Sequence, residues 1–128
     1  MELKRDQPIL LIDDEESIAE TLCELLQSFD FKVEMTCAGE FAKDLISSRQ
    51  FSLIVCDVNL GGKITSDELI RLAKNRNPTQ AVVMMSGDID RRDLRIQALL
   101  QAYPDISTLE KPFDVSAIVN FFPQKQGA

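Results

Sequence analysis

Short apolar segments alternate with longer amphipathic segments along this chain of 128 residues. The most informative apolar segment is residues 53–57 (LIVCD), a hydrophobic run that ends in an acid and precedes a turn with two glycines. A run of this kind is typical of a strand buried on both faces, in the centre of a parallel sheet. Further strands are predicted at residues 8–12, 31–35, 81–85 and 106–109. Residues 31–35 alternate apolar and polar side chains, which indicates an edge or half-exposed strand.

A segment with apolar residues at helical spacing follows each predicted strand. The predicted helices cover residues 18–29, 41–46, 65–77, 91–103 and 115–122. The predicted buried face of the first consists of Ile18, Leu22, Leu25, Leu26 and Phe29. The same reasoning places Phe41 and Leu94 on the buried faces of the second and fourth helices. Thr65 and Glu68 have the spacing of a capping box, so Thr65 is expected to start the third helix.

Five strands that alternate with five helices predict an α/β fold of the (βα)₅ type. In such a fold the sheet is parallel and helices cover both of its faces. The sequence contains no internal repeat, low-complexity tract or linker, so residues 1–128 are expected to form a single domain. A chain of this length buries about two thirds of its unfolded surface, enough for a stable core.

Composition and charge narrow the range of partners and sites. The net charge of −7 argues against direct contact with nucleic acid or an anionic membrane, because both attract clustered Lys and Arg. The longest apolar runs are about five residues, far fewer than the roughly 20 that span a bilayer. The three cysteines form no CxxC pair and there is no histidine, so we expect buried thiols rather than a zinc site. A cytoplasmic location is expected.

Polar side chains follow four of the five predicted strands. Asp13 and Asp14 follow the first strand, Asp57 ends the third, Ser86 follows the fourth and Lys111 follows the fifth. The carboxyl ends of parallel strands lie at one edge of the sheet, where open α/β folds bind their ligands. We therefore expect these five side chains to form one site.

The residue types at this expected site suit a divalent cation and a phosphoryl group. Three clustered carboxylates repel one another, so one takes up a proton unless a cation is present. Together with Lys111 they have a formal net charge of −2, which one Mg²⁺ neutralises, and Mg²⁺ prefers oxygen ligands. The Ser86 hydroxyl and the Lys111 ammonium are suited to hold phosphoryl oxygens. Asp57 is expected to be the nucleophile and to form an aspartyl phosphate.

The segments ILLIDDEES, LIVCDVNL, VVMMSGD and EKPF resemble, in this order, the receiver domain of two-component response regulators. The resemblance covers nearly the whole chain. It implies a flavodoxin-like, doubly wound sheet of five parallel strands in the order 2-1-3-4-5. It also implies that Asp57 takes a phosphoryl group from a phosphohistidine on a histidine kinase or phosphotransfer protein. The phosphorylated domain then signals by protein contact, with a downstream target protein or with an output domain that this sequence lacks.

The same resemblance assigns roles to the other residues of the site. The implied Mg²⁺ ligands are Asp14, Asp57 and the backbone carbonyl of Asn59, with Asp13 acting largely through water. Ser86 and Lys111 are expected to contact the phosphoryl group, and the Lys111–Pro112 peptide bond is expected to be cis. The resemblance implies self-phosphorylation and self-dephosphorylation only, so the domain is not expected to be an enzyme acting on other substrates.

Three positions depart from the usual receiver pattern. Gly61 stands where receivers usually have proline, which predicts a more mobile loop. Ser66 lies near the position of a common helix-start glycine. Thr108 stands at the switch position, where receivers usually have a Tyr or Phe that moves inward together with the residue at position 86. Because Thr cannot fill the pocket of an aromatic ring, we predict that output runs through other elements, such as residues 87–103.

Two other functions compete with the phosphoacceptor role. One is a degenerate receiver that binds partners without phosphorylation, which Thr108 and the glycine loop favour and the intact acidic site disfavours. The other is a Mg²⁺-dependent phosphohydrolase of the haloacid-dehalogenase type. Those enzymes need a second acid two residues after the nucleophile, whereas Asn59 is an amide and cannot act as a general acid or base.

Overall fold

The computed structural model describes residues 6–87 and 94–122, and in that part of the chain five parallel strands form one sheet. The strands are β1 (Ile9–Ile12), β2 (Val33–Thr36), β3 (Leu53–Asp57), β4 (Val82–Ser86) and β5 (Ser107–Glu110). Their order across the sheet is β2-β1-β3-β4-β5, with every neighbouring pair parallel. The predicted doubly wound α/β fold is confirmed.

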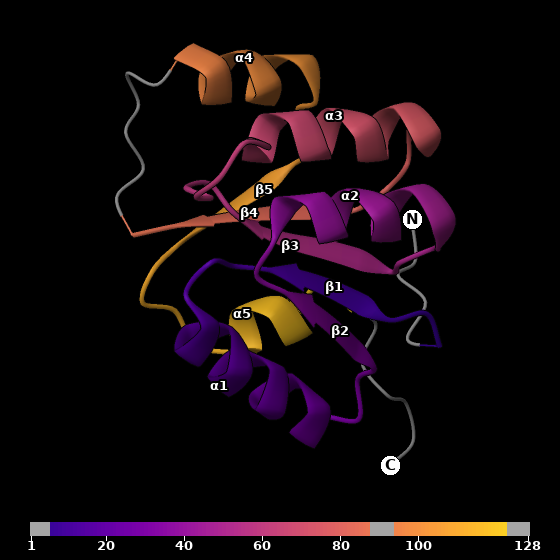
Figure 1. Cartoon of the computed structure of the whole chain (residues 1–128). Helices are drawn as coiled ribbons and strands as arrows, with labels where there is room; N and C mark the ends of the chain where they lie inside the picture. The colour runs from indigo at the N-terminus through magenta and orange to yellow at the C-terminus, as the bar shows by residue number, and fades with distance from the viewer. Residues whose placement is uncertain (1–5, 88–93, 123–128) are drawn as a thin grey trace.

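The helices lie on both faces of the sheet. They are α1 (Glu16–Ser28), α2 (Gly39–Ser48), α3 (Ser66–Arg76), α4 (Leu94–Ala102) and α5 (Ser116–Val119). Helices α1 and α5 cover one face, and α2, α3 and α4 cover the other (Figure 1). The first three residues of the predicted fourth helix, 91–93, lie outside the described residues. No helix in the described ranges has both the length and the apolar character needed to cross a membrane.

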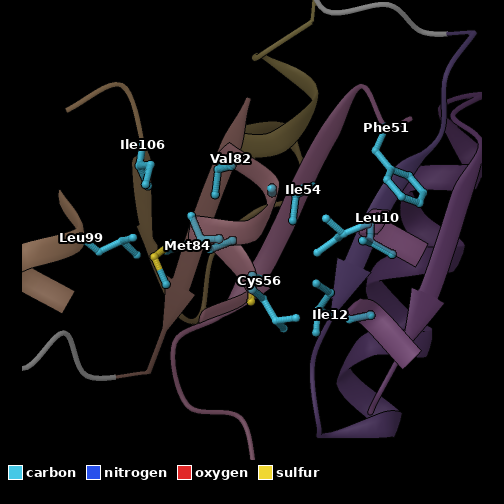
Figure 2. Close-up of a cluster of buried hydrophobic side chains, with 14 of the residues drawn as sticks. Leu10, Ile12, Phe51, Ile54, Cys56, Val82, Met84, Leu99 and Ile106 are labelled. Carbon is cyan, nitrogen blue, oxygen red and sulfur yellow. The ribbon is translucent and has the colours of Figure 1, made fainter. Parts of the chain in front are cut away.

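The hydrophobic core has two layers because side chains alternate between the faces of each strand. The layer under α2, α3 and α4 contains the alternate strand residues Leu10, Ile12, Ile54, Cys56, Val82 and Met84 (Figure 2). The layer under α1 and α5 contains Ile9, Leu11, Leu53, Val55, Val83 and Met85. Burial of each large side chain contributes about 2 kcal/mol. The central strands β1, β3 and β4 are therefore held rigidly from both sides, and their ends form a fixed platform.

The predicted strands lie within two residues of the observed ones, and the largest shift is at β2. This strand begins at Val33 rather than Phe31. The Phe31 amide donates to the Leu26 carbonyl and so lies in the turn that closes α1, while Asp30 has a positive φ of 68° that reverses the chain. The Phe31 ring then packs on Phe122, with ring centroids 4.5 Å apart. As predicted, β2 is an edge strand.

Several predicted helix faces are correct only in part. On α1, the buried side chains are Ala19, Leu22 and Leu26, whereas Ile18, Leu25 and Phe29 are each about two fifths exposed. The sheet contacts only a narrow stripe of this helix, so the flanks of its apolar face remain in solvent. Phe41 and Leu94 are even more exposed, at 61% and 78%.

Two smaller predictions concern a helix cap and the thiols. Thr65 is the N-cap of α3, as predicted, but its side chain makes no capping hydrogen bond. Cys56 is fully buried, and this burial raises the pKa of its thiol well above the ordinary range. The negative charge of Asp57 raises the same pKa further, by a smaller amount. Cys23 and Cys37 are only partly buried, so the expected role as a buried hydrophobe holds for Cys56 alone.

Candidate functional site

The five predicted site residues lie at one edge of the sheet, at the carboxyl ends of four adjacent strands. β1 leads into Asp13 and Asp14, β3 ends at Asp57, β4 ends at Ser86 and β5 leads into Lys111. The order of the sheet reverses between β1 and β3, because the chain goes outward to β2 before it returns. Open α/β sheets have a crevice at such a point. The topology alone therefore brings the acids of β1 and β3 together.

Lys111 joins the two buried acids of the site. Its Nζ donates to Asp57 Oδ2 at 2.9 Å and to Asp13 Oδ2 at 3.0 Å. Asp13 is 0% exposed and Asp57 is 5% exposed, so neither carboxylate has much access to water. Buried charges need partners of opposite charge. Here a single ammonium compensates two carboxylates, which leaves the site with excess negative charge.

Backbone amides fix the second oxygen of each buried acid. Asp57 Oδ1 accepts from the Asn59 amide at 2.9 Å, and Asp13 Oδ1 accepts from the Glu15 amide at 3.0 Å. The latter contact lies at the start of α1, where an acid also interacts favourably with the helix dipole. Both carboxylates are therefore held in one orientation by the chain that follows them.

Asp14 completes a cluster of three acids. Each of Asp13, Asp14 and Asp57 offers a carboxylate oxygen, and these three oxygens lie within 4.8 Å of one another. Asp14 is exposed at the rim, and its Oδ2 accepts from the Gly61 amide at 3.1 Å. Hard oxygen donors at this spacing suit a divalent cation such as Mg²⁺ or Ca²⁺. The cluster could hold such an ion.

The electrostatics of the site follow from burial and from this crowding of acids. Burial raises the pKa of the Asp57 carboxyl, and Asp13 raises it further, against the opposing effects of the Asn59 amide and Lys111. Burial alone lowers the pKa of the Lys111 ammonium, but its hydrogen bonds to Asp57 and Asp13 outweigh this and leave it raised. Lys111 is therefore charged at neutral pH, and Asp57 is more basic than an ordinary aspartate.

The remaining predicted residues lie around this cluster. Ser86 is buried at the end of β4, and its backbone carbonyl accepts from the Lys111 amide at 2.7 Å. Asn59 is exposed two residues after Asp57. The Lys111–Pro112 bond is cis, as expected. Thr108, in contrast, is exposed on β5 beside Met84, two residues before the strand ends, and does not join the cluster.

Two loop contacts at the site have no counterpart in the sequence prediction. The Gly61 amide binds Asp14, as described above, and the buried Ser66 hydroxyl donates to the Val58 carbonyl at 2.7 Å. Both contacts involve a backbone group of the loop between β3 and α3, Gly61 or Val58, and Ser66 is the first residue of α3. The first contact leaves no mark in the sequence, because its donor is a backbone amide. The only sequence signal for the second is a small residue at position 66. This loop also lines a hollow of about 210 Å³, together with Asp14 and Arg95 of α4.

An apolar groove opens on the other side of the site. It has a volume of about 430 Å³ and runs between α1 and the segment after Lys111. Its lining includes Ile18, Leu25, Phe113 and Lys111 itself. Two of these, Ile18 and Leu25, are among the side chains of α1 that the sheet leaves exposed. The groove therefore places hydrophobic surface directly beside the charged site.

Comparison with known proteins gives a consistent match. Residues 9–122 match the family model of the response regulator receiver domain. Over 112 residues the chain is 32% identical to the transcriptional regulatory protein FixJ of Azorhizobium caulinodans, a match that covers 88% of this chain and 51% of FixJ. The chain spans between 23% and 51% of the lengths of the curated relatives it matches.

Solved structures share the fold. A CheY-like receiver domain protein from Methanospirillum hungatei has a TM-score of 0.78 and 19% identity, covering 89% of this chain and 88% of that one. A response regulator from Burkholderia pseudomallei also has a TM-score of 0.78, with 23% identity and coverage of 92% and 67%. The latter structure contains a phosphorylated aspartic acid, a calcium ion and citrate.

Proposed function

Because this chain belongs to the response regulator receiver domain family of two-component systems, we propose that Asp57 is its phosphoacceptor. The donor is a phosphohistidine on a histidine kinase or phosphotransfer protein, and the reaction depends on Mg²⁺. The observation that carries this proposal is the position of Lys111, whose Nζ bridges Asp57 and Asp13 at 2.9 and 3.0 Å. A cation that binds the acceptor carboxylate can neutralise the charge of an incoming phosphoryl group at the same place.

The proposed transfer is a substitution at phosphorus. A carboxylate oxygen of Asp57 forms a bond to phosphorus while the bond between phosphorus and the histidine nitrogen breaks. The electron pair of the broken bond stays on that nitrogen, which takes up a proton and leaves as neutral imidazole. Lys111 and the Ser86 hydroxyl are proposed to bind the phosphoryl oxygens, whose negative charge is repelled by Asp13 and Asp14. The raised pKa of Asp57 makes its carboxylate a better nucleophile than an ordinary aspartate.

The acidic cluster fits a bound Mg²⁺. The residues proposed to hold the ion are Asp14, Asp57 and the Asn59 carbonyl, with Asp13 acting through water. When bound, the ion supplies two positive charges that offset the repulsion between the acids and the phosphoryl group. The three carboxylate oxygens within 4.8 Å of one another support this assignment. The phosphorylated aspartic acid and the calcium ion in the Burkholderia pseudomallei structure make the same combination chemically reasonable here.

Partner contact is the proposed output. The apolar groove beside Lys111 and the exposed Ile18 and Leu25 support docking of another protein next to the site, since exposed apolar patches mark interaction surfaces. The phosphorylated form is proposed to act on a target protein or on an output domain in the same polypeptide, in the cytoplasm. In this role the domain modifies only itself, and neither nucleic acid nor membrane is bound by it directly.

Intact mass after incubation with acetyl phosphate and Mg²⁺ tests the proposal. We expect one phosphoryl group on the wild type and on Asp44→Ala, which removes an exposed acid of α2. We expect none on Asp57→Ala, or on the wild type in EDTA. Failure of the wild type to gain mass, in a sample shown to be folded, contradicts the proposal and favours a receiver that binds partners without phosphorylation.

A further inference from the structure

A single backbone hydrogen bond joins two loops at the rim of the site. The Gly61 amide donates to Asp14 Oδ2 at 3.1 Å, across 47 residues of sequence. Asp14 belongs to the loop between β1 and α1, and Gly61 to the loop between β3 and α3. The bond therefore connects the chain that carries Asp14 with the chain that follows Asp57.

Asp14 is the acid of the cluster that most needs such a contact. Asp13 and Asp57 are buried and each is held through both oxygens. Asp14 is exposed, and an exposed side chain is free to change rotamer, at a cost in entropy when it is fixed. Hydrogen bonds from a backbone amide to a carboxylate are strong because the acceptor is charged. The Gly61 amide is thus the contact that holds Asp14 toward the other two acids.

This hydrogen bond leaves Asp14 able to bind a metal ion. A carboxylate has about four lone-pair sites on its two oxygens. One of them, on Oδ2, accepts from Gly61, which leaves the other lone pairs of the carboxylate for an ion. Hydrogen bonds to the outer side of a ligand fix its orientation, and their loss typically weakens metal binding by about 10- to 100-fold.

We propose that the Gly61 amide is a positioning group for the metal site, which orients Asp14 for a divalent cation. The inference rests on the proposed function in one respect: both take the carboxylates of Asp13, Asp14 and Asp57 as the cation site. Ser66 supports it from the far side of the loop, because its buried hydroxyl fixes the Val58 carbonyl at 2.7 Å. The loop after Asp57 is therefore held at two points, across its ends by the Ser66–Val58 bond and in its middle by the Gly61–Asp14 bond.

The chain allows a matched pair of variants at this position. A Cβ at Gly61 would meet only Asp14 Oδ2, at an ordinary distance of 3.4 Å, and the backbone there is not in the left-handed region. Gly61→Ala therefore keeps the N–H and fits. Gly61→Pro removes the N–H, because proline has no amide hydrogen. The two variants share the loss of glycine flexibility, and proline alone lacks the donor, while its ring also fixes φ.

Binding of Mn²⁺, measured from the electron paramagnetic resonance signal of the free ion, tests the proposal without any phosphoryl transfer. We expect Gly61→Pro to bind about 10- to 100-fold more weakly than Gly61→Ala, and Gly61→Ala to match the wild type. If the two variants bind Mn²⁺ with equal affinity while the wild type is still phosphorylated, the inference about Gly61 is overturned and the proposed function is not. Absence of Mn²⁺ binding by the folded wild type overturns it together with the Mg²⁺ dependence of the proposed function.

A second measurement does not depend on how well the proline variant folds. In metal-free protein, Asp14→Asn weakens the acceptor of the Gly61 amide. We expect the amide proton of residue 61 to move upfield in the nuclear magnetic resonance spectrum of Asp14→Asn, in the wild-type and Gly61→Ala backgrounds alike. An unchanged resonance for residue 61 overturns the inference.

Discussion

The Nζ atom of Lys111 lies 2.9 Å from Asp57 Oδ2, although 54 residues separate them in the sequence. Two parallel strands produce this contact, since β3 delivers Asp57 and β5 delivers Lys111 to the same edge of the sheet. The strand between them, β4, ends at Ser86, whose carbonyl binds the Lys111 amide. The pair is therefore fixed by the sheet rather than by flexible loops, and it sets the charge balance of the whole site.

Removal of Lys111 is expected to destabilise the metal-free protein. Lys111→Met leaves Asp13 and Asp57 buried without a counter-charge, and uncompensated buried charge of this kind costs about 3 kcal/mol. Urea unfolding in EDTA measures the loss, with Lys43→Met on the exposed face of α2 as control. Saturating Mg²⁺ is expected to reduce the difference. A loss as small as that of Lys43→Met contradicts the assigned role of Lys111.

The pH dependence of stability is expected to depend on Asp57. Burial, and then Asp13, raise the pKa of this carboxyl above its ordinary value of 3.8. Between pH 3.8 and the raised pKa, the Asp57 carboxyl is protonated in the folded state and already deprotonated in the unfolded state. The free energy of unfolding therefore falls as the pH rises through this window. Thermal melts in EDTA between pH 4 and pH 8 should show a flatter profile for Asp57→Asn than for Asp44→Asn. Parallel profiles contradict this prediction.

The strand ends could be predicted from the sequence, whereas the helix faces could be predicted only in part. A short apolar run such as residues 53–57, bounded by polar residues and glycine, is typical of a central strand, and parallel pairing then brings Asp13, Asp57 and Lys111 to one edge of the sheet. Leu25 and Phe41 each belong to an apolar helical pattern, but the pattern does not show how wide a stripe the sheet covers. The result is that 44% of Leu25 and 61% of Phe41 remain exposed.

The loop contacts were also beyond prediction, for a different reason. The bond from Gly61 to Asp14 uses a backbone donor, which every residue except proline possesses. The sequence showed only that Gly61 departs from the usual proline, and this suggested a mobile loop. The structure shows the Gly61 amide against a carboxylate, a contact that depends on how two loops meet in space.

The hydroxyl of Ser86 is expected to assist phosphorylation. Ser86→Ala should slow the reaction with acetyl phosphate by roughly 10- to 100-fold, because loss of one donor to a developing charge has an effect of about this size or larger. Ser107→Ala removes a hydroxyl from the other end of the neighbouring strand, where it pairs with Val83, and should react at the wild-type rate. Equal rates for the two variants would exclude Ser86 from the reaction.

Thr108 is expected to have no part in transmitting the signal. It is exposed on β5, whereas Arg95 of α4 lines the hollow that also contains Asp14 and Gly61. Beryllofluoride with Mg²⁺ mimics the phosphoryl group, and it should shift the amide resonances of α4 in the wild type and in Thr108→Val alike. Shifts confined to the loops that carry Asp13, Asp57 and Lys111 contradict a relay through α4.

Chemical identification of the modified residue tests the phosphoacceptor assignment most directly. After incubation with acetyl phosphate and Mg²⁺, borohydride reduces an aspartyl phosphate to homoserine, and peptide mass spectrometry locates the changed position. We predict homoserine at position 57, and none there when Mg²⁺ is replaced by EDTA. Homoserine at another aspartate, or unchanged peptides from a folded and Mg²⁺-loaded sample, would contradict the assignment of Asp57 as the acceptor.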